Sequence, residues 1–285
     1  MEGCYGILRE KIVRHDLHFG ERDLHAILKR FILFQSLRTN AALRRSKMAI
    51  TESPFGEALG KDSIPENIDI ISLMMQGFID VMGILDDLRI VLIENFTRRD
   101  FIMSDNPSII TNRWHLQRQG MSNFGLGSAG AMAFLPISPR IVAMLYDDGV
   151  YSVARSGLWI KTSKERDVLA VNEHQFLQCD KTVYFSSWDE VELIRQDLDH
   201  ALQNRPRESE RSELVTAALE SEDEWGKRYV VVPDSARQVG GECLVHMKSV
   251  NPCPHRWPSF MQFRRDAKFI DTGTGAGFLR RKSAS

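Results

Sequence analysis

Residues 132–146, MAFLPISPRIVAMLY, contain two short apolar runs that are separated by a turn-forming Ser138-Pro139 pair. Short runs of apolar and β-branched residues that are bounded by Pro, Gly or Asn are typical of β-strands. The whole segment 101–187 has this character. The strands that we expect are residues 101–103, 132–136, 141–146 and 183–186. We therefore predict a small, mostly antiparallel sheet in this part of the chain.

Helices are expected before this sheet. Residues 5–48 are rich in Leu, Ile and Arg without strand alternation, which favours one or two helices. A capping-box pattern at Ser63 to Glu66 opens a stripe of apolar residues at alternating spacings of three and four. The stripe comprises Ile71, Met74, Phe78, Val81, Leu85, Leu88 and Leu92. It predicts one long helix packed against the core, with an oligomer-forming coiled coil as the alternative.

Two more helix starts follow among and after the strands. Asn172, with Gln175 at the third helical position, is typical of a cap that opens a helix through about residue 180. Ser187 begins a second capping box, and the spacing of Val191 and Ile194 predicts a helix that continues to Leu202.

These elements predict an α+β fold in which N-terminal helices pack on a small, mostly antiparallel sheet, followed by a less ordered C-terminal extension. We expect a core domain at residues 1–203, helical over 1–97 and β-rich over 98–203. The polar run NRPRESERSE begins a charged linker and extension at 204–285. In this extension we expect an acidic helix near 212–225 and a strand near 229–232.

Composition limits the classes of partner. The 285 residues include 37 Lys and Arg against 38 Asp and Glu, so no global charge draws the chain to nucleic acid or an anionic membrane. Four cysteines are sparse for this length and suit a reducing compartment. The apolar segment 68–93 carries five charged residues, too many for a membrane span, and the N-terminus lacks a signal-peptide pattern. We expect a cytoplasmic protein that does not bind membranes.

Two motifs suggest cofactors, and neither is well formed. Residues 125–130 spell G-x-G-x-x-G, but a polar loop precedes them and a strand follows, whereas a dinucleotide site requires a helix there. Cys243, His246, Cys253 and His255 could hold zinc. However, the Cys-Pro-His spacing lies outside the usual pattern, so isolated cysteines and surface histidines are the favoured interpretation. The sequence indicates no other cofactor.

Basic residues form three clusters, which are Arg38, Arg44, Arg45 and Lys47; Arg264, Arg265 and Lys268; and Arg280, Arg281 and Lys282. Trp257, Phe260 and Phe263 interleave with the second cluster, an arrangement in which bases could stack while phosphates are neutralised. The neutral net charge favours solvated surfaces over nucleic-acid binding.

The tetrapeptide Ser104-Asp105-Asn106-Pro107 interrupts an otherwise apolar stretch. Asp and Asn side chains bond nearby backbone N–H groups and Pro fixes φ, so a turn accounts for it. Strand ends also commonly present catalytic groups, and here a carboxylate would stand beside an amide. Both interpretations stay open at the level of sequence.

Three segments taken together resemble one protein family. They are FIMSDNP at 101–107, FLPISP at 134–139, and Asn172 followed by VYFS at 183–186. Segments of these kinds occur in this order in the domain of unknown function 4238 family, so residues 68–187 resemble that family. Its members usually begin with a His/Pro/Tyr-containing segment for which we find no counterpart. A site that uses that histidine is therefore expected to be incomplete.

The family has no established activity, so the resemblance implies an architecture and a candidate cluster rather than a reaction. In the enzyme hypothesis the catalytic residues are Asp105, Asn106 and Asn172, and the substrate-binding residues are Ser104, Ser138 and His174. Its most concrete form is a hydrolase acting on a phosphate-containing or nucleic-acid substrate. The alternative is a non-enzymatic binding or regulatory module that uses the basic and aromatic C-terminal region.

Overall fold

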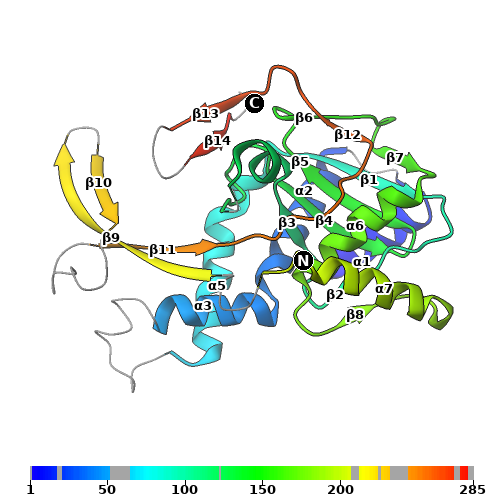
Figure 1. Ribbon diagram of the computed structural model, residues 1–285, viewed down its shortest axis with the longest axis horizontal. Helices are drawn as coiled ribbons and strands as arrows, with labels where there is room; N and C mark the ends of the chain where they lie inside the picture. Colours follow the sequence, from blue (N-terminus) through cyan, green and yellow to red (C-terminus); the bar gives the residue numbers. More distant parts are fainter. Residues whose placement is uncertain are drawn as a thin grey trace.

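The computed structural model describes residues 2–17, 21–51, 65–121, 123–206, 212–223, 226–231, 243–272 and 277–281, and it confirms the mixed α+β content (Figure 1). The helices are α1 (Glu2–Val13), α2 (Glu21–Leu37), α3 (Asn40–Thr51), α5 (Asn67–Val81), η2 (Met82–Leu85), η3 (His115–Gln119), α6 (Glu165–Gln178), η4 (Trp188–Glu190) and α7 (Val191–Leu202). The strands are β1 (Arg89–Asn95), β2 (Met103–Ser104), β3 (Ile109–Thr111), β4 (Met132–Ser138), β5 (Ile141–Tyr146), β6 (Tyr151–Val153), β7 (Trp159–Thr162), β8 (Val183–Tyr184), β9 (Ser212–Asp223), β10 (Gly226–Val231), β11 (Cys243–Ser249), β12 (Met261–Phe263), β13 (Phe269–Asp271) and β14 (Phe278–Arg280).

The largest sheet has the strand order β3-β4-β5-β1-β7, and all neighbours are antiparallel except β1 and β7. Side chains alternate between its two faces, as the pleat requires. In β1, Ile90 and Leu92 belong to one buried cluster, whereas Val91 and Ile93 belong to another. The central strands are therefore apolar at nearly every position because both faces are covered.

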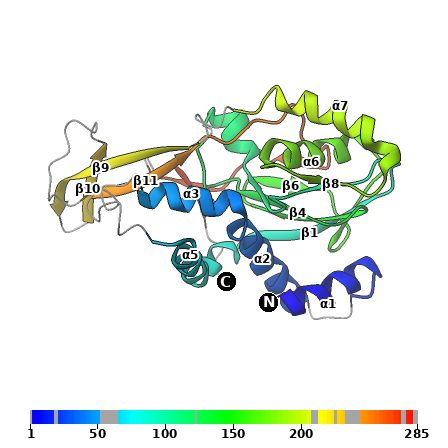
Figure 2. The same ribbon diagram turned by 90° about the horizontal axis from the view of Figure 1, so that it is seen from below.

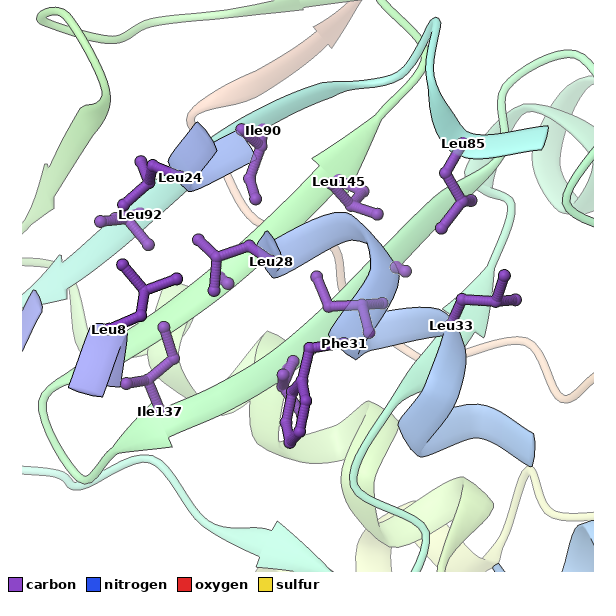
Figure 3. Packing of buried hydrophobic residues seen from close by; sticks show 14 of the residues in the cluster. Leu8, Leu24, Leu28, Phe31, Leu33, Leu85, Ile90, Leu92, Ile137 and Leu145 are labelled. Atoms are coloured by element: carbon purple, nitrogen blue, oxygen red, sulfur yellow. The ribbon is translucent and has the colours of Figure 1, made fainter. Parts of the chain in front are cut away.

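The first face is covered by α1 and α2, which lie on the side of the sheet opposite α6 and α7 (Figure 2). Leu8 of α1 and Leu28 of α2 pack with Leu92 of β1, Ile137 of β4 and Leu145 of β5 (Figure 3). All five side chains are at least 95% buried. This layer is the main reason why the N-terminal helices stay on the sheet.

The second face is covered by α6 and by a C-terminal segment, residues 252–263, which we call the strap. Val168 and Val171 of α6 pack in the same cluster as Phe134 of β4 and Met261 of the strap. Met261 lies in β12, which pairs with β6. The strap is therefore part of the core, although the sequence placed it in a less ordered extension.

A three-stranded sheet, β10-β9-β11, extends away from the core (Figure 1). The acidic helix expected near 212–225 is wrong, because β9 runs from Ser212 to Asp223 and pairs on both sides. Ala, Leu and Glu favour a helix locally, but pairing with two neighbouring strands overrides this weak propensity. The strand expected near 229–232 is β10.

The long helix expected from Ile71 to Leu92 is also wrong in its second half, and with it the helical character of 1–97. Helix α5 ends at Val81, and Leu92 lies in the buried strand β1. The three-four spacing continued by coincidence into β1, where the buried residues 90–93 are all apolar. Ser63 lies outside the described residues, and the capping box in the structure joins Glu66 and Asp69.

Of the two other predicted helix starts, the one at Ser187 is confirmed and the one at Asn172 is wrong. Ser187 is confirmed as a cap, since its hydroxyl accepts a hydrogen bond from the Asp189 backbone N–H at 3.2 Å. Asn172 is not a cap. It lies in the middle of α6, which begins at Glu165, and its amide bonds a different segment.

One stretch of the described residues, Asn67–Leu85 (α5 with η2), is long and apolar enough to cross a membrane by length and composition. The sequence interpretation counted Asp86, Asp87 and Arg89 against a span, but these residues follow the helix. Core helices of soluble proteins pass the same test, so the cytoplasmic location stays a prediction.

Candidate functional site

Asp105, in the turn after β2, forms hydrogen bonds with the backbone that follows α6. Its carboxylate oxygens accept hydrogen bonds from the backbone N–H groups of Asp180 at 2.8 Å, Lys181 at 2.7 Å and Thr182 at 3.1 Å. The Asp105 N–H in turn donates to the carbonyl of Thr182 at 2.9 Å. Both oxygens are therefore occupied by the backbone that follows the helix.

The neighbouring predicted residues Ser104, Asn106 and Asn172 also form hydrogen bonds between α6 and the segment around β2. Ser104 donates its hydroxyl to Gln175 Oε1 at 2.8 Å, and the Ser104 N–H donates to the same oxygen at 3.0 Å. Asn106 donates its amide to the carbonyl of Gln178 at 3.3 Å. Asn172 accepts from the N–H of Ile102 at 3.1 Å. The sequence missed Gln175 as a bonding partner because a glutamine inside a helix carries no local signal.

The three resembling segments do meet, at residues 101 and 102. The Phe101 N–H donates to the carbonyl of Pro139 at 2.9 Å, next to the Ile102 bond to Asn172. Among the described residues, the Ser138 hydroxyl accepts from the N–H of Arg140 in its own turn, at 3.2 Å. Asp105, Asn172 and Ser138 do not line either of the two hollows described below, and their catalytic and substrate roles stay predictions.

His174 faces the second cluster of the core. It is 1% exposed, and its ring lies 5.3 Å from that of Phe134 and 4.9 Å from that of Trp257. Burial lowers the pKa of His174 to about 3, so the imidazole is neutral at physiological pH. Its surroundings are those of a core side chain.

Replacing Asp105 with Asn separates a structural role from a catalytic one. One carboxylate oxygen becomes an NH₂ group that faces backbone donors, so hydrogen bonds to a charged group are lost, and such a bond contributes about 1.5–3 kcal/mol. We expect urea denaturation of Asp105→Asn to show a loss of that size. Asp189→Asn, on the exposed side of η4, should change stability by less than about 0.5 kcal/mol. Unchanged stability of Asp105→Asn would contradict the structural role.

A large groove opens beside this junction. Its volume is about 1040 Å³, and its walls come from α2, α3, the end of α5, η2, the turn before β3, the loop 124–126, the end of α6 and residues 250–252. Ala41, Arg44, Arg45 and Met48 recur at helical spacing on α3, so one face of α3 lines the groove. Asn106 lines it, whereas Asp105 and Asn172 do not.

The groove is basic along α3. Arg44 forms a two-point ion pair with Asp180, with Nη1 to Oδ2 at 2.8 Å, and this guanidinium holds the pKa of Asp180 below its usual range. Arg45 has no hydrogen bond or ion pair within the part of the chain that the structure describes. Desolvation lowers the pKa of Arg45, and the charge of Arg44 adds to this. An anion at Arg45 would favour the charged form of the guanidinium and so raise this pKa again.

The comparisons with known proteins identify a family. A family model described as Protein of unknown function (DUF4238) matches residues 1–189. The chain belongs to the DUF4238 family. No curated protein and no solved structure matches it. The DUF4238 match starts at residue 1, so it includes α1 to α3 as well as the segments that carry the resemblance. Arg44 and Arg45 therefore lie within the DUF4238 region, whereas Val250 and Pro252 lie outside it.

A second hollow of about 700 Å³ lies at the edge of the sheet by β7, within the DUF4238 region. His15 Nε2 pairs with Glu94 Oε1 at 3.0 Å, and its ring stacks on Trp159 at 4.7 Å. His15 and Glu94 therefore already have each other as partners. This leaves them less available to a ligand than Arg45 in the groove.

The zinc candidates receive no support from the described residues. His255 Nδ1 lies 2.7 Å from Glu173 Oε1, and Cys253 is an exposed free thiol. The side chains of Cys243 and His246 lie outside the described residues. Within the described ranges, no group of three or more His, Cys, Asp or Glu side chains is placed to hold a metal.

The other sequence motifs have structural roles. Trp257, Phe260 and Phe263 pack on the second core cluster, and the Arg113 guanidinium lies 4.8 Å from the Phe263 ring, so these rings are not a free stacking surface. In the glycine loop, Gly130 has φ 74°, and a Cβ there would lie 2.8 Å from Asn112 Oδ1. Strand β4 follows this loop, which agrees with the rejection of a dinucleotide site.

Proposed function

We propose that the groove beside α3 binds a phosphate-bearing ligand and that Arg45 is its principal charged contact. The observation that carries this proposal is a guanidinium that lines a large groove and has no partner among the described residues. Arg is well suited to phosphate because its planar fork donates two parallel hydrogen bonds. Lys47 lines the same groove and adds a second positive charge.

The surrounding structure supports this role by holding α3 in place. Arg44 is tied to Asp180, and Asp180 is positioned by its backbone bond to Asp105. The contacts of Asp105 thus help to fix the position of α3, whose basic residues line the groove. We assign Asp105 a positioning role in this proposal, and Asn106 a place on the groove wall.

The enzyme hypothesis from the sequence goes further and proposes that the bound phosphate ester is hydrolysed. Asp180 is a carboxylate that lines the groove, but its two oxygens pair with Arg44. Ligand binding is accordingly the function that the geometry supports best. Release of inorganic phosphate from a panel of phosphate esters, compared between wild type and Asp180→Asn, tests the reaction.

Replacing Arg45 with Gln is expected to weaken the binding of inorganic pyrophosphate by about 10-fold to 100-fold, because a hydrogen bond to a charged group contributes about 1.5–3 kcal/mol. Isothermal titration calorimetry at low ionic strength measures this change. Arg195→Gln is the matched control, since Arg195 is an exposed arginine on α7 away from the groove. Equal affinity of Arg45→Gln and wild type, or an equal loss in Arg195→Gln, would refute the proposed function.

A further inference from the structure

We infer that the ligand of the groove is an amphiphile, a phosphate head that carries an alkyl chain, rather than a nucleotide or a sugar phosphate. This inference rests on the proposed function, because it keeps the phosphate at Arg45. It adds that the remaining walls recognise a hydrocarbon chain.

The first argument comes from the hydroxyl and amide groups on the walls, which already have partners. Ser108 donates to the carbonyl of Ile32 at 2.7 Å, Ser36 to that of Leu33 at 2.7 Å, and Gln178 to that of Ile110 at 2.9 Å. Asn106 and Thr51 also donate to backbone carbonyls. A base or a sugar needs free donors and acceptors around its polar edges, whereas each of these hydroxyls, and one N–H of each amide, already donates to the protein itself.

The second argument comes from the apolar wall, which several elements contribute. Its members include Leu37 of α2, Met48 of α3, Val81 of α5, Ile84 of η2 and Leu126 of the glycine loop. Val81 is 43% exposed, and the other four are half-buried, so water touches apolar surface here. An alkyl chain would remove this surface from water, which is favourable by about 25 cal/mol per Å².

The third argument is the arrangement of charge and apolar surface on one helix face. Arg45 and Met48 are three residues apart on α3 and line the same groove. A head bound at Arg45 therefore places the first carbons of its chain beside Met48. The groove volume of about 1040 Å³ is at the upper end of ordinary ligand pockets, which leaves room for a chain.

The test is a series of monoalkyl phosphates from ethyl to octyl, each titrated by calorimetry below the concentration at which it forms micelles. Affinity should rise by about threefold to fourfold for each methylene that becomes buried. Octanol, which lacks the charge, should bind at least tenfold more weakly than octyl phosphate. Met48→Gln keeps the length of the side chain but makes the wall polar, so it should flatten the chain-length series.

Met75→Gln is the matched control, because Met75 is a half-buried methionine on α5 that does not line the groove. Thermal denaturation of each variant establishes that it is folded. If pyrophosphate binding depends on Arg45 but affinity does not rise with chain length, the amphiphile is refuted and the proposed function stands. If octanol binds as tightly as octyl phosphate, or Arg45→Gln binds pyrophosphate like wild type, both are refuted.

Discussion

A chain that ends at residue 206 is expected to lose the cooperative unfolding transition of the full chain. The strap would be missing, and Met261, which is fully buried, would leave a hole in the second core cluster. Burial of such a side chain contributes about 1.5–3 kcal/mol. Trp257, Phe260 and Phe263 would be lost with it.

The strap also donates hydrogen bonds to two buried carboxylates of α6. Asp167 accepts from the N–H of Ser259 at 2.7 Å, and Glu173 accepts from the N–H of His255 at 2.6 Å. Both carboxylates are at most 4% exposed, and losing such partners costs about 1–3 kcal/mol each. Together these three contributions amount to about 3.5–9 kcal/mol, which is comparable with the whole stability of many domains.

Urea denaturation followed by circular dichroism measures this loss. A synthetic peptide of residues 250–272 added in trans should restore the transition if the strap is the cause, and the same peptide with Ser259→Pro, which lacks the N–H, should restore it poorly. If the shortened chain keeps the midpoint of the full chain, the separate domain at 1–203 predicted from the sequence is right. We propose instead that residues 250–272 fold together with that part.

Acidification from pH 6.5 to 4.5 is expected to destabilise the protein through His174 by about 2–3 kcal/mol. Burial lowers the pKa of His174 from its ordinary value of 6.5 to about 3. Below pH 6.5 the unfolded chain binds a proton that the folded chain does not, so stability falls as pH falls. This loss continues until the pH approaches 3, where the folded form also binds the proton.

His174→Phe removes this histidine's contribution while keeping a ring beside Phe134. The free energy of unfolding, measured by urea denaturation at several pH values, should fall less steeply for His174→Phe, by about 1.4 kcal/mol per pH unit. The comparison concerns the slopes, so a constant packing cost in the variant does not affect it. Parallel slopes, or an NMR titration of His174 with a midpoint near 6.5, would show that this imidazole reaches water.

Strands with strong local signals were predicted well from the sequence. The apolar runs that became β4 and β5 have turn residues at their ends, and pairing them as neighbours satisfies both backbones. Strand β1 was missed because its buried centre, residues 90–93, is apolar at every position, so its residues also continue a helical stripe. Strand β9 was missed because its residues favour a helix until two neighbours pair with it.

For the candidate site, too, some features could be predicted from the sequence and others could not. The sequence raised the question whether the segments around Asp105, Pro139 and Asn172 meet, and the bonds of Phe101 to Pro139 and of Ile102 to Asn172 show that they do. The direction of each side chain could not be predicted, because it depends on which backbone groups lack partners at the junction. The carboxylate of Asp105 is used by the end of α6, and no local pattern signals that use.

The sequence by itself determined the α+β class, the family and the basic character of α3, since each depends on residue type and short spacing alone. Only the tertiary structure decided that Arg45 lines a groove without a partner among the described residues, and that the strap belongs to the core. Both depend on contacts between segments far apart in the chain. Such contacts are fixed by the burial of apolar surface and the pairing of backbone groups across the whole fold, which no local window of sequence contains.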